Sequence, residues 1–308
     1  MNPLTMALAL LAALSNAAAS VLQRRAATDE PEGGRGMRQA IRWLAGVLRR
    51  PHWLAGAGFL ALSTALQASA LALGSLSVVQ PLLVTELLFT LAVGSVVFHR
   101  RPDRRTWLAF MALAVGLALF LGGADPSPGR STAAPGRWLL TGVSLLGAVV
   151  LLVAVSRSVR GAPRAALLGM ASAVSFAATA ALLKEVTGQV ARDPGTVLAQ
   201  WPPYATVGAG AIAFLLLQSA LRAGTLTASQ PALTLGDALT SVVLGAVLFE
   251  EQIALGVRVL PEVTGVVLIG VGSIGLANAP SVRGAWDSAS STHNGADPGS
   301  PEPAPQRP

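Results

Sequence analysis

Long apolar stretches separated by short polar segments run along most of the chain. Most of them approach the ~20 residues that a helix needs to cross a bilayer. Backbone groups in lipid must be hydrogen-bonded internally, so each stretch predicts a membrane-spanning helix. The pattern therefore predicts an all-α integral membrane protein with about nine transmembrane helices. The stretches lie at about residues 3–22, 53–74, 78–98, 106–122, 138–155, 164–184, 204–222, 226–249 and 257–277.

The composition agrees with this class. Of the 308 residues, 52% are hydrophobic and only 12% are charged, whereas average soluble proteins are about 25% charged. The chain has no cysteine, which excludes disulfides and thiolate sites. Its three histidines are scattered along the sequence. It also lacks the GxxxxGK[ST] phosphate loop of an ATP-driven pump. We therefore expect no cofactor and no enzymatic activity. The net charge of +7 comes from arginines between apolar stretches, so we expect a lipid bilayer, not nucleic acid, as partner.

The distribution of basic residues predicts an orientation. With the N-terminus outside, 17 Arg residues fall in the connections assigned to the inside and four in those assigned to the outside. Cytoplasmic loops carry this excess in membrane proteins. The chain is therefore predicted to be a multi-pass protein of the plasma (inner) membrane, with its C-terminus in the cytoplasm.

The segments outside the main spans have different characters. Residues 1–22 form the first span, and its positive charges follow the apolar run, which favours an anchor over a signal peptide; the alanines at 17–19 leave cleavage open. Residues 23–52 form a basic cytoplasmic linker, either an interfacial helix or a solvated connector. Residues 278–308 have the composition of a disordered cytoplasmic tail.

Two parts of the chain repeat each other. Residues 67–98 read QASALALGSLSVVQPLLVTELLFTLAVGSVVF, and residues 218–249 read QSALRAGTLTASQPALTLGDALTSVVLGAVLF. The second and third spans thus match the seventh and eighth, five spans later, and an odd displacement reverses direction in the membrane. The chain is therefore predicted to contain two inverted-topology repeats, at 53–155 (spans two to five) and 164–277 (spans six to nine).

Each repeated hairpin predicts the same local structure. The first helix should end in a left-handed glycine, Gly74 or Gly224, and Ser75 or Thr225 should cap the next one. A proline then interrupts the helix, which lipid tolerates only where the freed backbone groups face protein or a cavity. The expected helix breaks are at Pro81 and Pro231.

A polar stripe marks the eighth span. Its members are spaced by three and four residues, so they share one helical face. Such a stripe can line a substrate path or can join helices by hydrogen bonds; Asp237 favours a path, because joining helices does not need a charge. The stripe consists of Thr227, Gln230, Thr234, Asp237 and Ser241.

The first repeat carries a matching carboxylate at Glu86. Thr90 follows one turn later, and Gln80 precedes Pro81. Ionisable groups at this depth are costly and are functional candidates, although Glu86 could also be a protonated structural residue. Asn16 in the first span either lines the same path or joins helices. Asp237 and Glu86 are the candidates for binding a cation or a proton.

Other polar residues predict structure only. Lys184, near the end of the sixth span, is expected to extend to the membrane surface. Glu250 and Glu251 follow the eighth span and are expected in a solvated loop. The glycines of the last span and the Ser172, Ser175 and Thr179 face of the sixth predict close helix packing.

These features resemble the drug/metabolite transporter superfamily (EamA-like), and within it most nearly the NIPA-type magnesium transporter branch. The resemblance rests on SVLQRRA after the first span, on SLSVVQPL and TLTASQPAL in the hairpins, and on the span endings FHRRP and FEEQ. It covers about residues 4–277 and implies nine spans with the N-terminus outside. His99-Arg100 replaces the acidic residue usual at that ending, whereas Glu250 keeps it.

The sequence thus predicts a secondary transporter or facilitator that moves Mg²⁺ or another cation by alternating access. The magnesium assignment comes from the resemblance; carboxylates with hydroxyl and amide neighbours could hold a partly hydrated Mg²⁺. Two alternatives stay open: a proton-coupled exporter of a small organic metabolite or drug, and a non-transporting membrane scaffold. The expected partners are lipid, a small ion or molecule, and a second copy of the chain.

Overall fold

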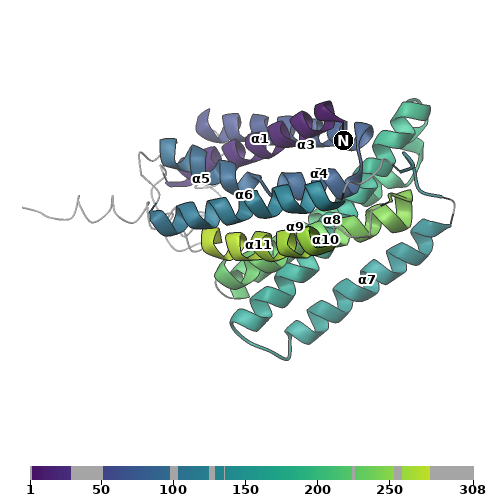
Figure 1. The fold of residues 1–308 in the computed structure, drawn as a ribbon. Coiled ribbons are helices and arrows are strands. Elements are labelled where there is room, and N and C mark those ends of the chain that lie inside the picture. Colours follow the sequence, from purple (N-terminus) through teal and green to yellow (C-terminus); the bar gives the residue numbers. More distant parts are fainter. Residues whose placement is uncertain are drawn as a thin grey trace, which may run out of the picture.

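The computed structural model describes residues 2–28, 51–97, 103–124, 129–134, 136–223, 226–252 and 259–277. These residues form helices and connections without a strand (Figure 1). The helices are α1 (Pro3–Thr28), α3 (Pro51–Leu73), α4 (Leu76–Leu83), α5 (Glu86–Val97), α6 (Arg104–Ala124), α7 (Arg137–Ser156), α8 (Ala162–Arg192), the short η1 (Val197–Ala199), α9 (Pro202–Ala223), α10 (Leu226–Phe249) and α11 (Val259–Ala277).

The predicted all-helical membrane class is confirmed. Within the described part of the chain, 8 spans are long and apolar enough to cross a membrane, and α11 holds a shorter apolar stretch, Val263–Leu276. Large apolar side chains face outward on the peripheral helices: Leu139 and Leu140 of α7 and Val207 of α9 are each more than 70% exposed. An apolar surface of this kind would be unfavourable in water, and hydrocarbon would cover it.

The third span is two helices. α4 continues through Pro81 and ends at Leu83, and α5 begins at Glu86. Between them the backbone closes tighter turns: Val84 N donates to Pro81 O at 3.1 Å, and Leu87 N donates to Val84 O at 3.1 Å. The break therefore lies after the proline, immediately before the carboxylate of Glu86. In α10, by contrast, the helix runs through Pro231 without interruption, so the predicted break there is absent from the structure. The longer helix α10 tolerates the loss of the one backbone hydrogen bond that its proline cannot donate.

The turn between α3 and α4 differs from its prediction. Gly74 is not in the left-handed conformation; the described glycines with positive φ are Gly136 and Gly161. Glycine is required at 74 for space, because an added Cβ would lie 2.3 Å from Cγ2 of Thr5 in α1. The corresponding turn at 224–225 lies outside the described residues, as do linker residues 29–50 and the tail at 278–308.

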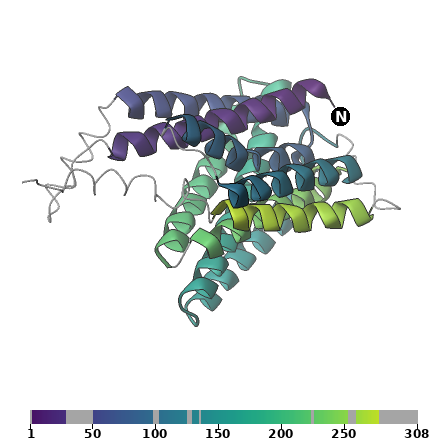
Figure 2. The same ribbon diagram turned by 60° about the vertical axis from the view of Figure 1, so that its left-hand side comes forward.

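Three helix pairs pack closely: α1 with α3, α8 with α9, and α6 with α11. The first and the last of these pairs lie side by side in both views (Figures 1 and 2). Ser63 Oγ of α3 donates to Ala12 O of α1 at 2.8 Å, and Ser172 Oγ of α8 donates to Ala213 O of α9 at 2.8 Å. The third pair, α6 with α11, meets at backbone distance: an added Cβ on Gly272 would lie 2.6 Å from Leu113 N. The packing roles predicted for Ser172 and for the glycines of the last span agree with these contacts.

Candidate functional site

The polar stripe of α10 lies on its inner side. Thr234 and Ser241 are buried, and Asp237 is half-buried with its Oδ1 atom enclosed. No described group donates a hydrogen bond to Asp237 Oδ1, and Ser241 Oγ likewise has no partner in that part of the chain. The side chains of Thr227 and Gln230 lie outside the described residues. Three of the five predicted members therefore share an enclosed face.

Helix α4 brings a further polar group to this face. α4 packs against α10 with its first residues beside the last turn of α10, so the two helices run antiparallel. Ser77 lies opposite Gly245, because an added Cβ on Gly245 would meet Ser77 Oγ at 2.6 Å. About one turn inward, roughly 5 Å along a helix, come Gln80 on α4 and Ser241 on α10. Gln80 is 3% exposed, and its Nε2 also lacks a partner among the described residues.

Glu86 has different surroundings. It opens α5, directly after the break in the third span, and the side chain of Asn16 on α1 lies near its carboxyl group. α1 packs against α5, so the first helix supplies a polar neighbour for the carboxylate. Thr90 lies one turn further along α5 and is half-buried. Asn16 thus lies beside a candidate site residue at the contact between α1 and α5, and both interpretations of its role stay predictions.

Enclosed polar atoms without partners are costly. Burying a polar group without a hydrogen bond costs roughly 1–3 kcal/mol by protein mutational data, and most such groups in native proteins are satisfied. Asp237 offers an acceptor, Gln80 a donor and Ser241 both. A ligand that donates to the first and accepts from the second, such as a hydrated cation or an ammonium group with a neighbouring oxygen, would satisfy this set.

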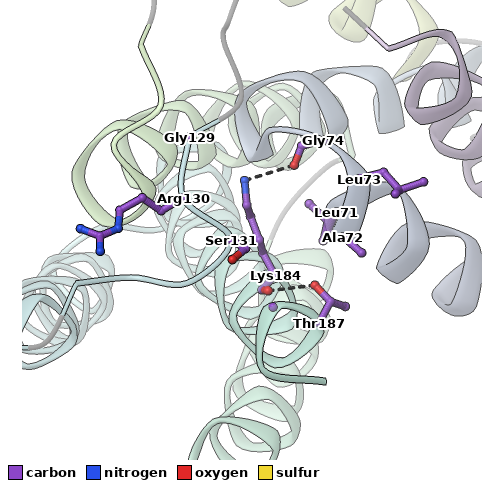
Figure 3. A pocket seen from close by; sticks show the side chains of 10 residues that line it. Leu71, Ala72, Leu73, Gly74, Gly129, Arg130, Ser131, Lys184 and Thr187 are labelled. Atoms are coloured by element: carbon purple, nitrogen blue, oxygen red, sulfur yellow. Dashed lines mark hydrogen bonds between the residues drawn. The ribbon is translucent and has the colours of Figure 1, made fainter. Parts of the chain in front are cut away.

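A buried ion pair that the sequence analysis did not anticipate lies at one end of the bundle. Lys184 Nζ of α8 lies 2.5 Å from Glu251 Oε1, and the two side chains are 4% and 0% exposed. Lys184 also donates to Gly74 O at 3.1 Å (Figure 3), and its ammonium lies 4.8 Å from the ring centre of Phe249. The predictions of a surface-reaching Lys184 and a solvated Glu251 are wrong, because α8 continues past Lys184 to Arg192 and both side chains are buried.

Glu251 also caps α4. Its carboxylate accepts from the backbone N–H of Leu76 at 2.6 Å, from Ser77 N at 2.9 Å and from Ser77 Oγ at 2.5 Å. The first N–H groups of a helix lack internal partners and carry partial positive charge, so a carboxylate suits this position. Ser75 makes no side-chain cap, contrary to its prediction. The cap comes instead from a residue 175 positions away in the sequence.

The neighbouring Glu250 lies in a different environment. It has a positive φ of 56°, and its exposed carboxylate meets Arg137 at 2.9 Å and Arg130 at 3.6 Å. The backbone beside it is held as well, since Arg130 N donates to Phe249 O at 2.6 Å. The unusual backbone conformation at Glu250 lets the carboxylate of Glu250 point to solvent and that of Glu251 point to the interior.

Glu185 anchors the segment that precedes α7. Its Oε2 accepts from Ala133 N at 2.8 Å and from Trp138 Nε1 at 3.2 Å. Lys184 and Glu185, adjacent in α8, thus hold two different parts of the chain at the same end of the bundle. Beside them opens a cavity of about 90 Å³, whose lining includes Gly74, Ser131, Lys184 and Thr187 (Figure 3). Its volume admits several water molecules.

The described residues contain no group of three or more His, Cys, Asp or Glu side chains that could hold a metal ion. A cation at Asp237 or Glu86 would therefore be held by one carboxylate with neutral oxygens. Such a ligand set suits a partly hydrated or singly charged ion better than a fully dehydrated divalent one.

One sequence signal could have revealed the ion pair. Lys184 is the only lysine in a chain with 21 arginines. The arginines lie in connections and at span ends, where charge sets orientation, whereas lysine is a compact point charge that one carboxylate can neutralise. Nothing local to Glu251 distinguishes it from Glu250, since only the folded chain brings α4 against the end of α10.

Comparison with known proteins relates the chain to a bacterial protein. No family model and no solved structure matches the chain. An uncharacterized protein of Corynebacterium glutamicum is 31% identical over 274 residues, an alignment that covers 84% of this chain and 92% of the relative. The shared region extends across nearly all of both proteins, so the chain belongs to the same family as this corynebacterial protein.

Proposed function

We propose that this protein is a secondary transporter or facilitator that moves a cation, or a small organic solute bearing a positive charge, by alternating access. Its site would lie between α4 and α10, with Glu86 as a second carboxylate near the broken span. Nine membrane spans in two inverted repeats, with the N-terminus outside and the C-terminus in the cytoplasm of a plasma membrane, belong to the same proposal.

The observation that carries it is the enclosed and unsatisfied Asp237 Oδ1, with Ser241 Oγ and Gln80 Nε2 similarly without partners in the described chain. A purely structural stripe would use its polar atoms to join helices, as Ser172 does on α8. An unsatisfied carboxylate oxygen within an apolar helix is unfavourable until a ligand or proton reaches it. This contrast supports transport over the alternative of a membrane scaffold.

The break between α4 and α5 supports the same proposal. Discontinuous spans at the centre of transporters present free backbone carbonyls and helix ends to the transported ion. Here the N–H groups of Val84 and Leu87 donate to Pro81 and Val84. These two N–H groups therefore bond three residues back and not to the carbonyls of Gln80 and Leu83, as they would in a continuous helix.

The identity of the cation is the finer part of the proposal. Resemblance to the NIPA-type branch suggests Mg²⁺, which would have to keep several waters, because each candidate site has a single carboxylate. A proton-coupled exporter of an organic cation is the second candidate. It is favoured by the pairing of an acceptor on Asp237 with a donor on Gln80, which a molecule with both functions would satisfy.

The test is transport by purified protein in reconstituted vesicles. Uptake of Mg²⁺, of organic cations and of amino acids would be compared in vesicles with the wild-type chain, with Asp237→Asn and with Asp193→Asn. Asp193 is exposed at the end of α8 and provides the same substitution outside the proposed path. Loss of transport in Asp237→Asn alone would support the site, whereas equal transport by all three would remove it. No transport of any tested compound would favour the scaffold.

A further inference from the structure

The ion pair of Lys184 and Glu251 joins the two predicted repeats. Glu251 follows α10 of the second repeat, and its carboxylate holds the first turn of α4 in the first repeat through Leu76 and Ser77. Lys184, on α8 of the second repeat, adds a bond to Gly74 at the α3–α4 turn. One buried carboxylate therefore fixes the end of α4 to α8 and to the end of α10.

The packing around this carboxylate is specific. An added Cβ on Gly245 would lie 2.2 Å from Glu251 Oε2 and 2.6 Å from Ser77 Oγ, so glycine is what leaves room for the cap. Phe249 is fully buried beside the lysine. Gly245 and Phe249 lie about one and about two helical turns beyond Ser241 on α10. They therefore close the end of the α4–α10 contact that leads to the polar site.

Solvent can reach one side of this closure. The cavity of about 90 Å³ has Lys184 and the α3–α4 turn in its lining, and Ser131 beside it is exposed. Water entering there would weaken the attraction between Lys184 and Glu251, because the strength of an ion pair falls steeply as the local dielectric rises. The ion pair is therefore stable when water is excluded and can separate when water enters the cavity.

We propose that Lys184, Glu251 and the first turn of α4 form a gate that closes one end of the transport path and separates in each cycle. The predicted topology places this end outside the cell. Lys184 and Glu251 are positioning residues in this proposal, since they act by holding α4 against α10 and do not bind the transported solute. The gate rests on the proposed transport function, but its opening can be measured without transport.

The absence of cysteine allows a direct measurement of opening. A single cysteine at Leu244, which is 3% exposed and lies on the Ser241 face between the polar site and Phe249, would report access by a water-soluble maleimide in open membrane fragments. With the gate intact, labelling should be slow. Glu251→Gln or Lys184→Met should raise its rate on the order of tenfold or more, because a broken buried pair loses several times the free energy that a tenfold change requires.

Three controls separate opening from unfolding. Leu113→Cys, buried at the α6–α11 contact, should stay slow in every gate variant, whereas unfolding would expose both cysteines. Gln200→Cys is exposed and should label rapidly throughout. Glu250→Gln breaks only the exposed pair and should leave Leu244→Cys unchanged. Gly245→Ala keeps every charge but displaces the Glu251 carboxylate, so it should raise labelling as Glu251→Gln does.

The outcomes distinguish the two proposals. Unchanged labelling at 244 in Glu251→Gln, Lys184→Met and Gly245→Ala would overturn the gate, even if the wild-type protein transports a solute. Parallel increases at 113 and 244 would also overturn it, by assigning the pair to stability alone. Selective increases at 244 in a protein that transports nothing would leave a gate of two separable repeats and would remove the transport function instead.

Discussion

Adjacent carboxylates at the end of α10 provide a sharp test of the described geometry. Glu250→Gln and Glu251→Gln make the same chemical change one residue apart. Glu250 pairs with Arg137 at a surface where both side chains are about two-fifths exposed, whereas Glu251 and Lys184 are almost fully enclosed. The two substitutions should therefore differ greatly in their effect on the free energy of unfolding.

The magnitudes follow from burial. Exposed ion pairs contribute about 0–1 kcal/mol, so Glu250→Gln should change the free energy of unfolding by less than ~1 kcal/mol. Removing one partner of a buried pair costs about 3–5 kcal/mol, because the remaining charge is left uncompensated. In Glu251→Gln one of the two carboxylate oxygens becomes an amide NH₂, which would face the N–H donor of either Leu76 or Ser77 and could not accept from it. We expect a loss near the upper part of that range.

Unfolding in mixed detergent micelles with increasing dodecyl sulfate, followed by tryptophan fluorescence and circular dichroism, would measure both changes. The double variant Lys184→Met/Glu251→Gln should lose less than the two single losses added together, since it removes the uncompensated charge. Losses within 1 kcal/mol of each other for Glu250→Gln and Glu251→Gln would refute the reasoning. So would strictly additive losses in the double variant.

Other expectations can be checked separately. A reporter fused after Ala279 should be cytoplasmic and one within residues 124–135 should be outside, because 17 basic residues are assigned inside and four outside; the opposite pattern would reverse the orientation. If the cation is Mg²⁺, expression should restore growth of a magnesium-uptake-deficient host at low Mg²⁺, whereas drug or metabolite resistance without that effect would favour the exporter. Thr234→Ala and Ser241→Ala should lower the transport rate less than loss of the stripe's carboxylate does, as neutral ligands contribute less than charge-assisted contacts; a larger effect from either would move the site. Bonds from the Thr106 side chain and backbone hold the pKa of Asp103 below its ordinary value, so its stabilisation of α6 should be present above pH ~4 and be lost as pH falls through the lower folded pKa; an Asp103→Ala variant whose stability keeps the wild-type acid dependence would contradict this.

The fold class could be predicted because apolar periodicity and span length are local properties. The positions of the helices were close to prediction, including the α3–α4 hairpin, since glycine and proline mark ends whatever their detailed conformation. The reason for a glycine at position 74 was not predictable, because the side chain that an added Cβ would meet is Thr5 on another helix. Similarly, the sequence did not predict that α8 extends past Lys184, because contacts with distant parts of the chain determine where this helix ends.

The candidate site was predictable in part for the same reason. Asp237 and Ser241 could be identified because a polar stripe on one apolar helix can be recognised within a short stretch of sequence. The contact of Asn16 with Glu86 joins α1 to α5, and both residues had been identified, but their pairing had not. The Lys184–Glu251 pair could not be predicted from any single stretch of sequence, because its members are 67 positions apart and the helix that Glu251 caps begins 175 positions before it.

The glycine contact between α6 and α11 has a consequence for how the chain is assembled. α6 comes early in the sequence and α11 is the last described helix, yet Gly116 and Gly265 approach so closely that an added Cβ on either would lie within 2.8 Å of the other's carbonyl oxygen. If the chain stopped after residue 156, α6 would present this glycine-lined surface to lipid without the helix that packs against it. The two halves of the chain should therefore depend on each other for folding, and a chain divided at residues 157–161 should accumulate only when both fragments are made in the same cell.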